Sequence, residues 1–271
     1  NSSGRIAPEI LYSASLCGVH RIFRIGGAQA IAAMAYGTQS IPRVDKIFGP
    51  GNRYVTKAKQ LVADRVAIDM PAGPSEVLVM ADDTAHPSFV AADMLSQAEH
   101  GPDSQAILVC NSEEMAQQVK AEVERQAALL KRASSVEQSL AHSPIVVLAS
   151  RADMIDFANV YAAEHLIISM AQPWDVAQQI TAAGSIFIGT SSPESAGDYA
   201  SGTNHTLPTS GYARAFSGVN LDSYIRKITY QELTPEGLSV LAPTIVAMAD
   251  AEGLDAHAAA VKVRVEQLQK V

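Results

Sequence analysis

The sequence predicts an α/β fold with parallel sheets in two units, followed by a helical C-terminal tail. Short β-rich runs alternate with helical patterns through the first 190 residues, which is typical of parallel strands with helices on both faces. A cluster of proline and glycine at residues 69–74 interrupts this alternation and could join two α/β units. Beyond residue 214, two helical patterns follow with no strand between them.

Seven apolar runs have the length and composition of buried strands. They lie at residues 21–25, 44–48, 77–80, 106–110, 145–148, 166–169 and 185–188. Helical patterns precede or separate them at residues 8–17, 27–36, 54–64, 88–98, 112–130, 152–163 and 173–183. Two of these open with proline, which suits the first helical position because the N–H it lacks would have no partner there.

The segment that follows the last predicted strand is polar. Residues 191–214 are rich in glycine, serine, threonine and proline, and loops of that length are uncommon unless they are functional. Residues 234–250 and 254–269 are predicted to form the two helices of the tail.

The composition is that of an ordinary globular protein. Of 271 residues, 48% are apolar and 18% charged, so the chain can bury a substantial core. The net charge of −8 makes non-specific binding to nucleic acid or an anionic membrane unfavourable. No apolar run approaches the roughly 20 residues that span a bilayer. Cys17 and Cys110 stand in apolar stretches and are expected to be buried, and so few cysteines fit a reducing cytoplasm.

Among seven histidines, His100 has neighbours that suit metal binding. It ends a predicted helix, with Gln97 three residues earlier, so the two side chains are helical neighbours. An imidazole nitrogen and an amide oxygen can both coordinate a divalent metal, and imidazole suits zinc. The alternative is an ordinary helix end, with Gly101 and Pro102 as the stop.

Glu164 and His165 form a second candidate, where a predicted helix ends and an apolar strand begins. Ligands of α/β proteins bind at sheet edges, at the carboxyl ends of strands or at switch points, so this position favours a functional role. A histidine beside a carboxylate can act as a general base. The alternative is a pair of polar residues in a loop.

Further polar residues lie in the loop and the tail. The loop offers Glu194, Asp198 and His205 in a glycine-rich setting, which can wrap a polar ligand or simply lie on the surface. His257 opens the last predicted helix, with Glu252 five residues before it.

Two glycine-bearing turns, at residues 26–27 and 49–51, each follow a predicted strand and precede a helix. Backbone N–H groups at such a turn can hold a phosphate. The second turn lacks the third glycine of the G-x-G-x-x-G pattern, because Tyr54 stands in that place. A tight strand-to-helix turn explains both equally well.

Seven strings, in this order, resemble the histidinol dehydrogenase family. They are GGAQAIAA at residues 26–33, DKIFGPGN at 45–52, AIDMPAGPSEVLV at 67–79, LSQAEHGPDSQ at 95–105, EHLII at 164–168, SPESAGDYASGTNH at 192–205 and LPTSGY at 207–212. The resemblance runs from about Ile6 to the C-terminus. It implies two incomplete Rossmann-like parallel-sheet units plus a helical C-terminal tail: residues 1–74 contacting NAD, 75–219 holding zinc and substrate, and 220–271 as the tail.

The resemblance also implies roles for individual residues. The acid/base pair matches Glu164 and His165. The Zn²⁺ ligands match Gln97, His100, Asp198 and His257. The substrate-binding residues match Ser75, Gln97, His100, His165, Asp198, His205, Glu252 and His257. The NAD contacts that match in this chain are Gln29 and Asn52.

The implied activity is the four-electron oxidation of L-histidinol through L-histidinal to L-histidine with two NAD, the last step of histidine biosynthesis. Zinc would act as a template that fixes the substrate. His165 would accept the alcohol proton and serve again in the second oxidation, while Glu164 would activate water for aldehyde hydration. The resemblance further implies a cytoplasmic homodimer with exchanged tails, in which Glu252 and His257 serve the partner's site.

Two departures from the family pattern accompany the resemblance. A long N-terminal part is absent, which in the family completes one α/β unit and adds an aromatic contact to NAD, so we expect this chain to be a piece of something longer. Residues 63–69 are also a few residues shorter than the pattern. Three alternatives stay open: a paralogue oxidising another small polar alcohol such as a sulfonated diol, a zinc hydrolase that uses no nucleotide, and a non-catalytic fragment.

Overall fold

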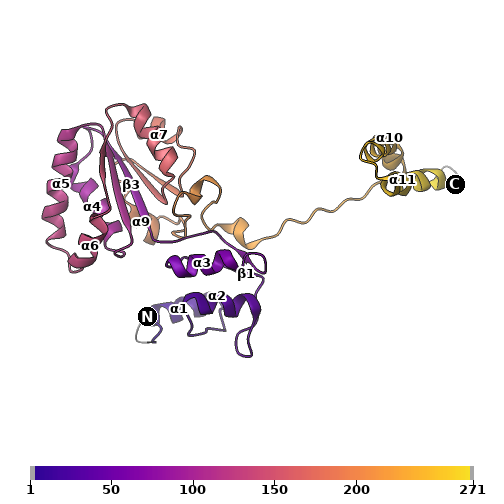
Figure 1. Ribbon diagram of the computed structural model, residues 1–271, viewed down its shortest axis with the longest axis horizontal. Coiled ribbons are helices and arrows are strands. Elements are labelled where there is room, and N and C mark those ends of the chain that lie inside the picture. The colour runs from indigo at the N-terminus through magenta and orange to yellow at the C-terminus, as the bar shows by residue number, and fades with distance from the viewer. Residues whose placement is uncertain (1–3, 269–271) are drawn as a thin grey trace. The chain divides into compact units, whose positions relative to one another are not determined.

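The protein has an α/β fold in a computed structural model that describes residues 4–268 (Figure 1). The chain forms two compact units, Asn1–Tyr224 and Ile225–Val271. All strand pairs described are parallel, as the alternation of strands and helices predicted. Among residues 4–268, no helix has the length and apolar character needed to cross a membrane.

A five-stranded parallel sheet forms the centre of the first unit. Its strands are β3 (Glu76–Ala81), β4 (Gln105–Cys110), β5 (Ile145–Val147), β6 (His165–Ser169) and β7 (Ser185–Ile188), in the order β5-β4-β3-β6-β7. The chain builds outward from β3 in one direction and then from β6 in the other, so the switch point lies between these two strands.

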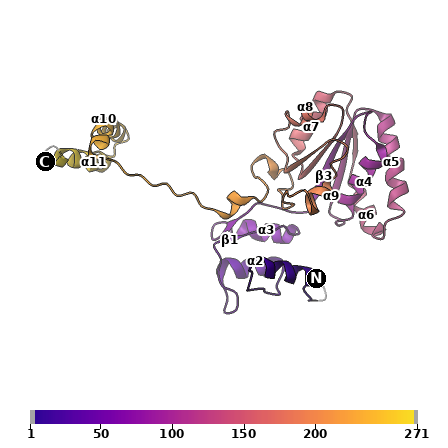
Figure 2. The ribbon, with the colours of Figure 1, turned by 180° about the vertical axis from the view of Figure 1, so that it is seen from behind.

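Helices cover both faces of this sheet. Figure 1 shows α4 (Pro87–Ala98), α5 (Glu113–Ala127) and α6 (Ala133–Leu140) on one face and α7 (Arg151–Tyr161) on the other. Figure 2 shows the same layers from behind, with α8 (Pro173–Ala177) beside α7. Two helical layers explain why the interior of these strands, such as residues 77–81 and 106–110, is a continuous apolar run rather than an alternating one.

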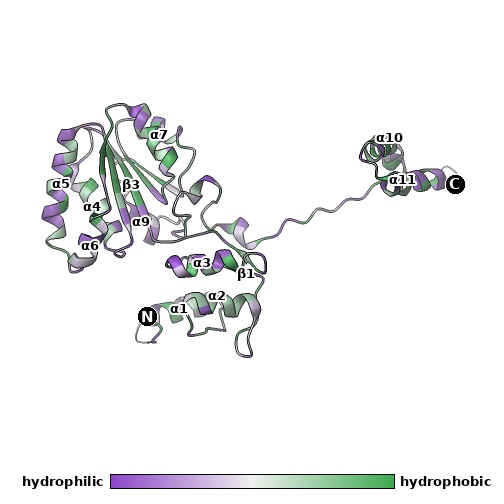
Figure 3. Cartoon of the chain, viewed as in Figure 1, coloured by the Kyte–Doolittle hydropathy of each residue, from purple (hydrophilic) through white to green (hydrophobic). Residues whose placement is uncertain are grey.

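The core is built from the alternation of side chains along β3. Val77 and Val79 pack with α4, α5 and α6, whereas Leu78 and Met80 pack with α7 and α8. All four side chains are fully buried. Figure 3 shows the central strands in the green of hydrophobic residues, while α5 carries purple, hydrophilic stretches.

A smaller parallel sheet lies in the N-terminal part of the same unit. It consists of β1 (Lys46–Ile47) and β2 (Ala67–Ile68), accompanied by α1 (Pro8–Leu16), α2 (Gly27–Tyr36) and α3 (Arg53–Leu61). The pattern predicted β1 but not β2, because a two-residue strand is defined by its partner and carries too little sequence to be recognised.

The predicted strand at residues 21–25 is wrong. The segment is irregular, and the apolar side chains of Ile22, Phe23 and Ile25 are 40–43% exposed. A strand needs a neighbour to satisfy its backbone N–H and C=O groups, and no strand within residues 4–268 pairs with this segment. Cys17 was also expected to be buried and is exposed, because it follows α1, which buries none of its residues; Cys110 is buried as predicted.

Three predicted boundaries also need correction. The long polar segment, residues 191–214, contains a short helix, α9 (Glu194–Tyr199), and one 3-10 turn, η1 (Tyr212–Arg214); a second such turn, η2 (Leu221–Tyr224), follows it. The helix predicted over 112–130 stops at Ala127 and is followed by the separate α6, and the one predicted over 173–183 stops at Ala177.

The second unit consists of two helices that pack on each other, α10 (Pro235–Ala251) and α11 (Asp255–Leu268). Thr234 begins α10, because its hydroxyl accepts a hydrogen bond from the N–H of Gly237 at 3.1 Å. Both tail helices are confirmed, although the predicted last position, Gln269, lies outside the described residues.

Candidate active site

The two candidate acid/base residues lie at the amino ends of the central strands. Strand register pairs Val77 of β3 with His165 of β6, which sets Glu76 beside Glu164. The pair therefore flanks the switch point at the end opposite to the carboxyl edge, where ligands of α/β sheets usually bind. Helix α4 runs back from the carboxyl end of β3 and delivers His100 to the amino end of the sheet.

Glu164 is almost completely buried. Its Oε2 accepts a hydrogen bond from the N–H of Glu76 at 2.9 Å, and its own N–H donates to Glu76 Oε1 at 3.3 Å. Burial raises the pKa of Glu164 to about 9, a rise that the hydrogen bond from Glu76 opposes and the neighbouring carboxylates reinforce. The carboxyl group is therefore neutral at pH 7 unless a positive charge comes close.

His165 has one ring nitrogen surrounded by acceptors and one without a partner. Nδ1 lies 3.3 Å from Glu76 O, 3.7 Å from Glu164 Oε2 and 3.8 Å from Glu194 Oε1. Nε2 is buried without a hydrogen bond, 3.8 Å from Asp198 Oδ1. Burial lowers the pKa of His165 to about 4, although the charge of Asp198 opposes this. The lowered pKa favours a neutral imidazole, and the contact with the Glu76 carbonyl favours the tautomer with its proton on Nδ1, which leaves the Nε2 lone pair free to accept a proton.

A potential metal site adjoins this histidine. Ligand atoms of His100, Glu194 and Asp198 all lie within 4.8 Å of one another. Glu194 and Asp198 are four residues apart on α9 and so share one face of that helix. Helix α4, which carries Gln97 and ends two residues before His100, packs against α9.

Unpartnered buried atoms indicate that a cation fits this cluster. Both amide atoms of fully buried Gln97, Oε2 of Glu194 and Nε2 of His165 have no hydrogen-bond partner. Each such atom costs on the order of 1–3 kcal/mol unless something binds it. Imidazole, amide and carboxylate donors together suit a divalent cation such as zinc.

Glu194 is the member of this cluster to which neither the spacing nor the family resemblance assigned a role. It is 1% exposed, and burial raises its pKa to about 8, with further contributions from Asp198 and Asp93. A helical interpretation of residues 194–199 would have placed it on the same face as Asp198. The glycine- and serine-rich composition indicated a loop instead.

A pocket of about 340 Å³ brings three predicted site residues together. Asn52, Ser75 and His100 line it, together with the glycine- and proline-containing segments 50–51, 73–74 and 101–104. The family resemblance implies contacts of Asn52 with NAD, of Ser75 with substrate and of His100 with the metal, so this pocket is a place where ligands of all three kinds could meet.

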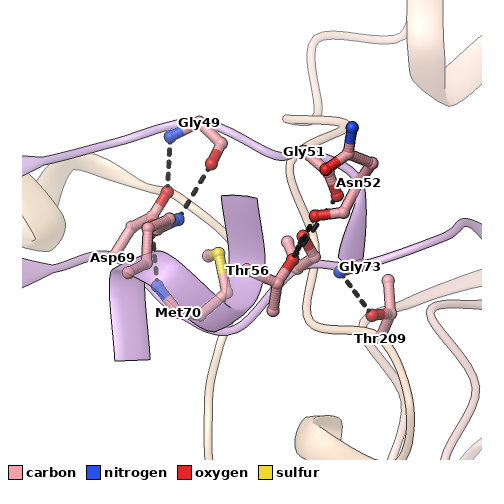
Figure 4. Close-up of polar contacts among 10 residues, drawn as sticks. Gly49, Gly51, Asn52, Thr56, Asp69, Met70, Gly73 and Thr209 are labelled. Atoms are coloured by element: carbon pink, nitrogen blue, oxygen red, sulfur yellow. Dashed lines mark hydrogen bonds and ion pairs between the residues drawn. The ribbon is translucent and has the colours of Figure 1, made fainter. Parts of the chain in front are cut away.

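Hydrogen bonds hold the turn that carries Asn52 (Figure 4). The side-chain oxygen of Asn52 caps α3 by accepting the N–H groups of Tyr54 and Val55, both at 3.1 Å. Asp69 Oδ2 accepts the N–H of Gly49 at 2.7 Å, and the hydroxyl of Thr56 donates to the carbonyl of Ala72 at 2.7 Å. The turn therefore presents Asn52 from a fixed backbone.

Known proteins identify the family of this chain. A sequence model described as histidinol dehydrogenase matches residues 1–265. The chain belongs to the histidinol dehydrogenase family. A protein of that name from Bacteroides fragilis is 60% identical over 271 residues, which is 100% of this chain and 63% of that protein. A protein of the same name from Vibrio cholerae is 56% identical over 268 residues, 98% of this chain and 62% of its own length.

A solved structure agrees with these relatives of the histidinol dehydrogenase family. The crystal structure of histidinol dehydrogenase from Elizabethkingia anophelis matches with a TM-score of 0.94 at 56% identity, covering 98% of this chain and 61% of that one. The resemblance stated from the sequence is confirmed. The chain spans about 63% of the length of the first curated relatives that it matches.

Within residues 4–268, four residues that the histidinol dehydrogenase resemblance assigned to the site belong neither to the cluster nor to the residues that line the pocket of Asn52, Ser75 and His100. Gln29 is exposed in the first turn of α2, and His205 is exposed in the loop beyond α9, from where its charge lowers the pKa of His165. Glu252 follows α10 and His257 lies in the first turn of α11, both exposed and both in the second unit. Their roles stay predictions.

Proposed function

We propose that the protein oxidises L-histidinol through L-histidinal to L-histidine in the cytoplasm, using Zn²⁺ and NAD, as the last step of histidine biosynthesis. The main structural support for this proposal is the buried His165. Its Nε2 has no hydrogen-bond partner and lies 3.8 Å from Asp198, a member of the potential metal site. Membership of the histidinol dehydrogenase family supports the substrate. The proposal concerns the whole protein, of whose relatives the chain spans about 63%.

Gln97, His100, Asp198 and His257 would hold the cation. When bound, Zn²⁺ supplies a fixed positive charge that orients the substrate's nitrogen atoms. Ser75, His205 and Glu252 would complete the substrate site. The pocket that Ser75 shares with His100 supports this arrangement.

Gln29 and Asn52 would contact NAD, which accepts a hydride in each of the two oxidation steps. Asn52 suits this role because it shares a pocket with Ser75 and lies on a hydrogen-bonded turn. The strand order β5-β4-β3-β6-β7 supports a Rossmann-like description of residues 75–219, and we retain the division into 1–74, 75–219 and 220–271 as part of the proposal.

His165 performs the proton transfers in this proposal. Its Nε2 accepts the proton of the substrate hydroxyl in the first oxidation, returns it to the aldehyde oxygen as water adds, and accepts the hydroxyl proton of the hydrated aldehyde in the second oxidation. Glu164 and Glu194 lie near Nδ1, and their anions, which a positive charge in the adjacent cluster favours, would stabilise the imidazolium that forms. Glu164 accepts a proton from the water that adds to L-histidinal. For this step the carboxyl group of Glu164 must be ionised. A positive charge in the adjacent cluster lowers its pKa and so makes that anion accessible.

The direct test is NAD reduction with L-histidinol, followed by near-ultraviolet absorbance, before and after chelator treatment and zinc readdition. We expect two NADH for each L-histidinol, loss of turnover with the chelator and recovery with zinc. The full-length Bacteroides fragilis relative serves as a positive control under the same conditions.

Other outcomes would favour the alternatives. NAD reduction with a different small polar alcohol but not with L-histidinol would indicate the paralogue. Chelator-sensitive hydrolysis without NAD reduction would indicate a hydrolase. Zinc and L-histidinol binding by calorimetry without turnover would indicate a non-catalytic chain.

We also propose a homodimer that exchanges its C-terminal tails. Large apolar side chains of both tail helices are exposed, among them Val240 at 78%, Met248 at 61% and Val263 at 57%. Such surfaces are typical of protein–protein contacts. Exchange would bring Glu252 and His257 to the partner's site.

Mixing two inactive variants tests the exchange of tails. His257→Ala removes a ligand that the tail supplies, and Asp198→Ala removes a ligand that the rest of the chain supplies. In a mixed dimer with exchanged tails, one site would therefore have both ligands and the other would have neither. Random subunit exchange then restores about a quarter of wild-type turnover, since half of the dimers are mixed and half of their sites are intact. Native mass spectrometry verifies that mixed dimers form. Mixed dimers without any turnover would contradict exchanged tails.

A further inference from the structure

We propose that Glu76 is the positioning residue for the acid/base pair: its backbone and side chain together fix Glu164 and His165 and join them to the loop at residues 206–211. This inference rests on the proposed function and deepens it, since Glu76 has no role in the ligand or catalytic sets above. Strand register sets Glu76 directly beside Glu164 at the amino ends of β3 and β6.

Glu76 contacts the pair through its backbone first. Its N–H donates to Glu164 Oε2 at 2.9 Å, which fixes the carboxyl group of the proposed water activator. Its carbonyl oxygen lies 3.3 Å from His165 Nδ1, which favours the proton on that nitrogen and leaves Nε2 as the base. One residue thus orients both side chains of the pair.

The side chain of Glu76 then holds two backbone segments together. Oε1 accepts the N–H of Glu164 at 3.3 Å and the N–H of Ser210 at 3.0 Å. An apolar residue here, as at the next five positions of β3, would leave these two groups without that acceptor. Ser210 has a φ of 56°, a left-handed conformation that is costly for serine and needs such a contact to persist.

The loop that Glu76 holds also contacts the segment before β3. Thr209 is 1% exposed, and its hydroxyl oxygen accepts the N–H of Gly73 at 2.8 Å (Figure 4). Gly73 lines the pocket with Asn52 and Ser75. Displacement of Glu76 would therefore affect the acid/base pair and one wall of this pocket.

Glu76 is not among the residues that line that pocket. It lines a separate cavity of about 500 Å³ with Tyr161, Ser210 and Arg214. The Tyr161 hydroxyl lies 3.5 Å from Oε2 and donates to Gln105 Oε1 at 2.7 Å. Burial raises the pKa of Glu76 to about 7, so a carboxyl group is kept here against a desolvation cost. Because Glu76 does not line the pocket of Asn52 and Ser75, we assign it the role of a positioning residue rather than that of a substrate ligand.

Two substitutions distinguish the effect of the length of the Glu76 side chain from the effect of its charge. Glu76→Gln keeps the length and the carbonyl acceptor but loses the charge, whereas Glu76→Asp keeps the charge and cannot reach both N–H groups. We expect Glu76→Gln to retain kcat within about threefold and Glu76→Asp to lower kcat by about 10–100-fold, since a misplacement of about 1 Å costs that order of rate. KM for L-histidinol and zinc content should stay within twofold in both. Tyr161→Phe removes a hydroxyl that contacts Glu76 Oε2 and Gln105 but leaves the two N–H contacts of Oε1 in place, so it is the control and should retain wild-type kcat.

A readout independent of turnover distinguishes this inference from the proposed function. The ¹⁵N shifts of histidine-labelled protein report the tautomer of His165. We expect the Nδ1–H form in wild type and Glu76→Gln, even if L-histidinol proves not to be the substrate. In Glu76→Asp we expect a mixture, because loss of the contact with the N–H of Glu164 lets the start of β6 shift and moves the His165 ring away from the carbonyl of residue 76. An active Glu76→Asp with an inactive Glu76→Gln would overturn the inference, because charge rather than position would then matter. So would an unchanged tautomer in Glu76→Asp, or a parallel loss of kcat and zinc content.

Discussion

Replacement of His165 by asparagine is expected to lower L-histidinol oxidation by about 10²–10⁴-fold, the contribution of a positioned general base. An asparagine amide ends near the position of Nδ1, so the contact with the Glu76 carbonyl can persist while Nε2 is removed. Zinc content should not change, because the expected ligands Gln97, His100 and Asp198 are untouched. The measurements are kcat, KM and bound zinc on the same preparation.

The matched control is His142→Asn. His142 is exposed and lies outside the cluster, so this variant should retain wild-type kcat. A rate near that of the wild type for His165→Asn would show that another group accepts the alcohol proton. Loss of zinc together with turnover would instead show that His165 supports the metal cluster and is not primarily a base.

Most of the large sheet could be predicted from the sequence because its strands are buried on both faces. Runs such as 77–80 and 106–110 are apolar throughout, and that pattern does not depend on which strand lies next to them. The strand predicted at residues 21–25 is wrong because, unlike burial, strand pairing cannot be recognised from an apolar run alone. Apolar composition indicates that a segment tends to be buried, but hydrogen bonding as a strand also requires a neighbour, which the pattern does not contain.

The site was only partly predictable, because its geometry depends on tertiary contacts. Glu76 and Glu164 are 88 residues apart, and parallel register alone makes them neighbours. Helix α9 is missed for a similar reason: its composition indicates a loop, yet Gly197 fits closely against Phe187, where a Cβ would lie 2.7 Å from the ring. The histidinol dehydrogenase resemblance identified His100 and Asp198, which do lie together, but not Glu194.

Lys59→Met is expected to destabilise the protein by about 3–5 kcal/mol, the cost of leaving one charge of a buried ion pair without its partner. The side chains of Lys59 and Asp69 are 1% and 0% exposed and form an ion pair, and Lys59 Nζ also donates to the carbonyl of Gly49 at 2.8 Å. Urea unfolding, followed by circular dichroism, measures the loss. Lys57→Met is the matched control on the same helix; because Lys57 is exposed, its effect should stay within about 0.5 kcal/mol.

Removing both charges should recover much of this loss. In Lys59→Met/Asp69→Asn, no unpaired charge is buried, and the asparagine oxygen can still accept the N–H of Gly49, as Asp69 does in Figure 4. Equal unfolding free energies for Lys59→Met and Lys57→Met would contradict a stabilising pair. The same comparison tests the turn itself: if Lys59 and Asp69 fix the backbone that presents Asn52, the single variant weakens NAD binding under native conditions more than the double variant does. If the affinity for NAD is the same in wild type and in both variants, the capped first turn of α3 holds Asn52 without help from Lys59 and Asp69.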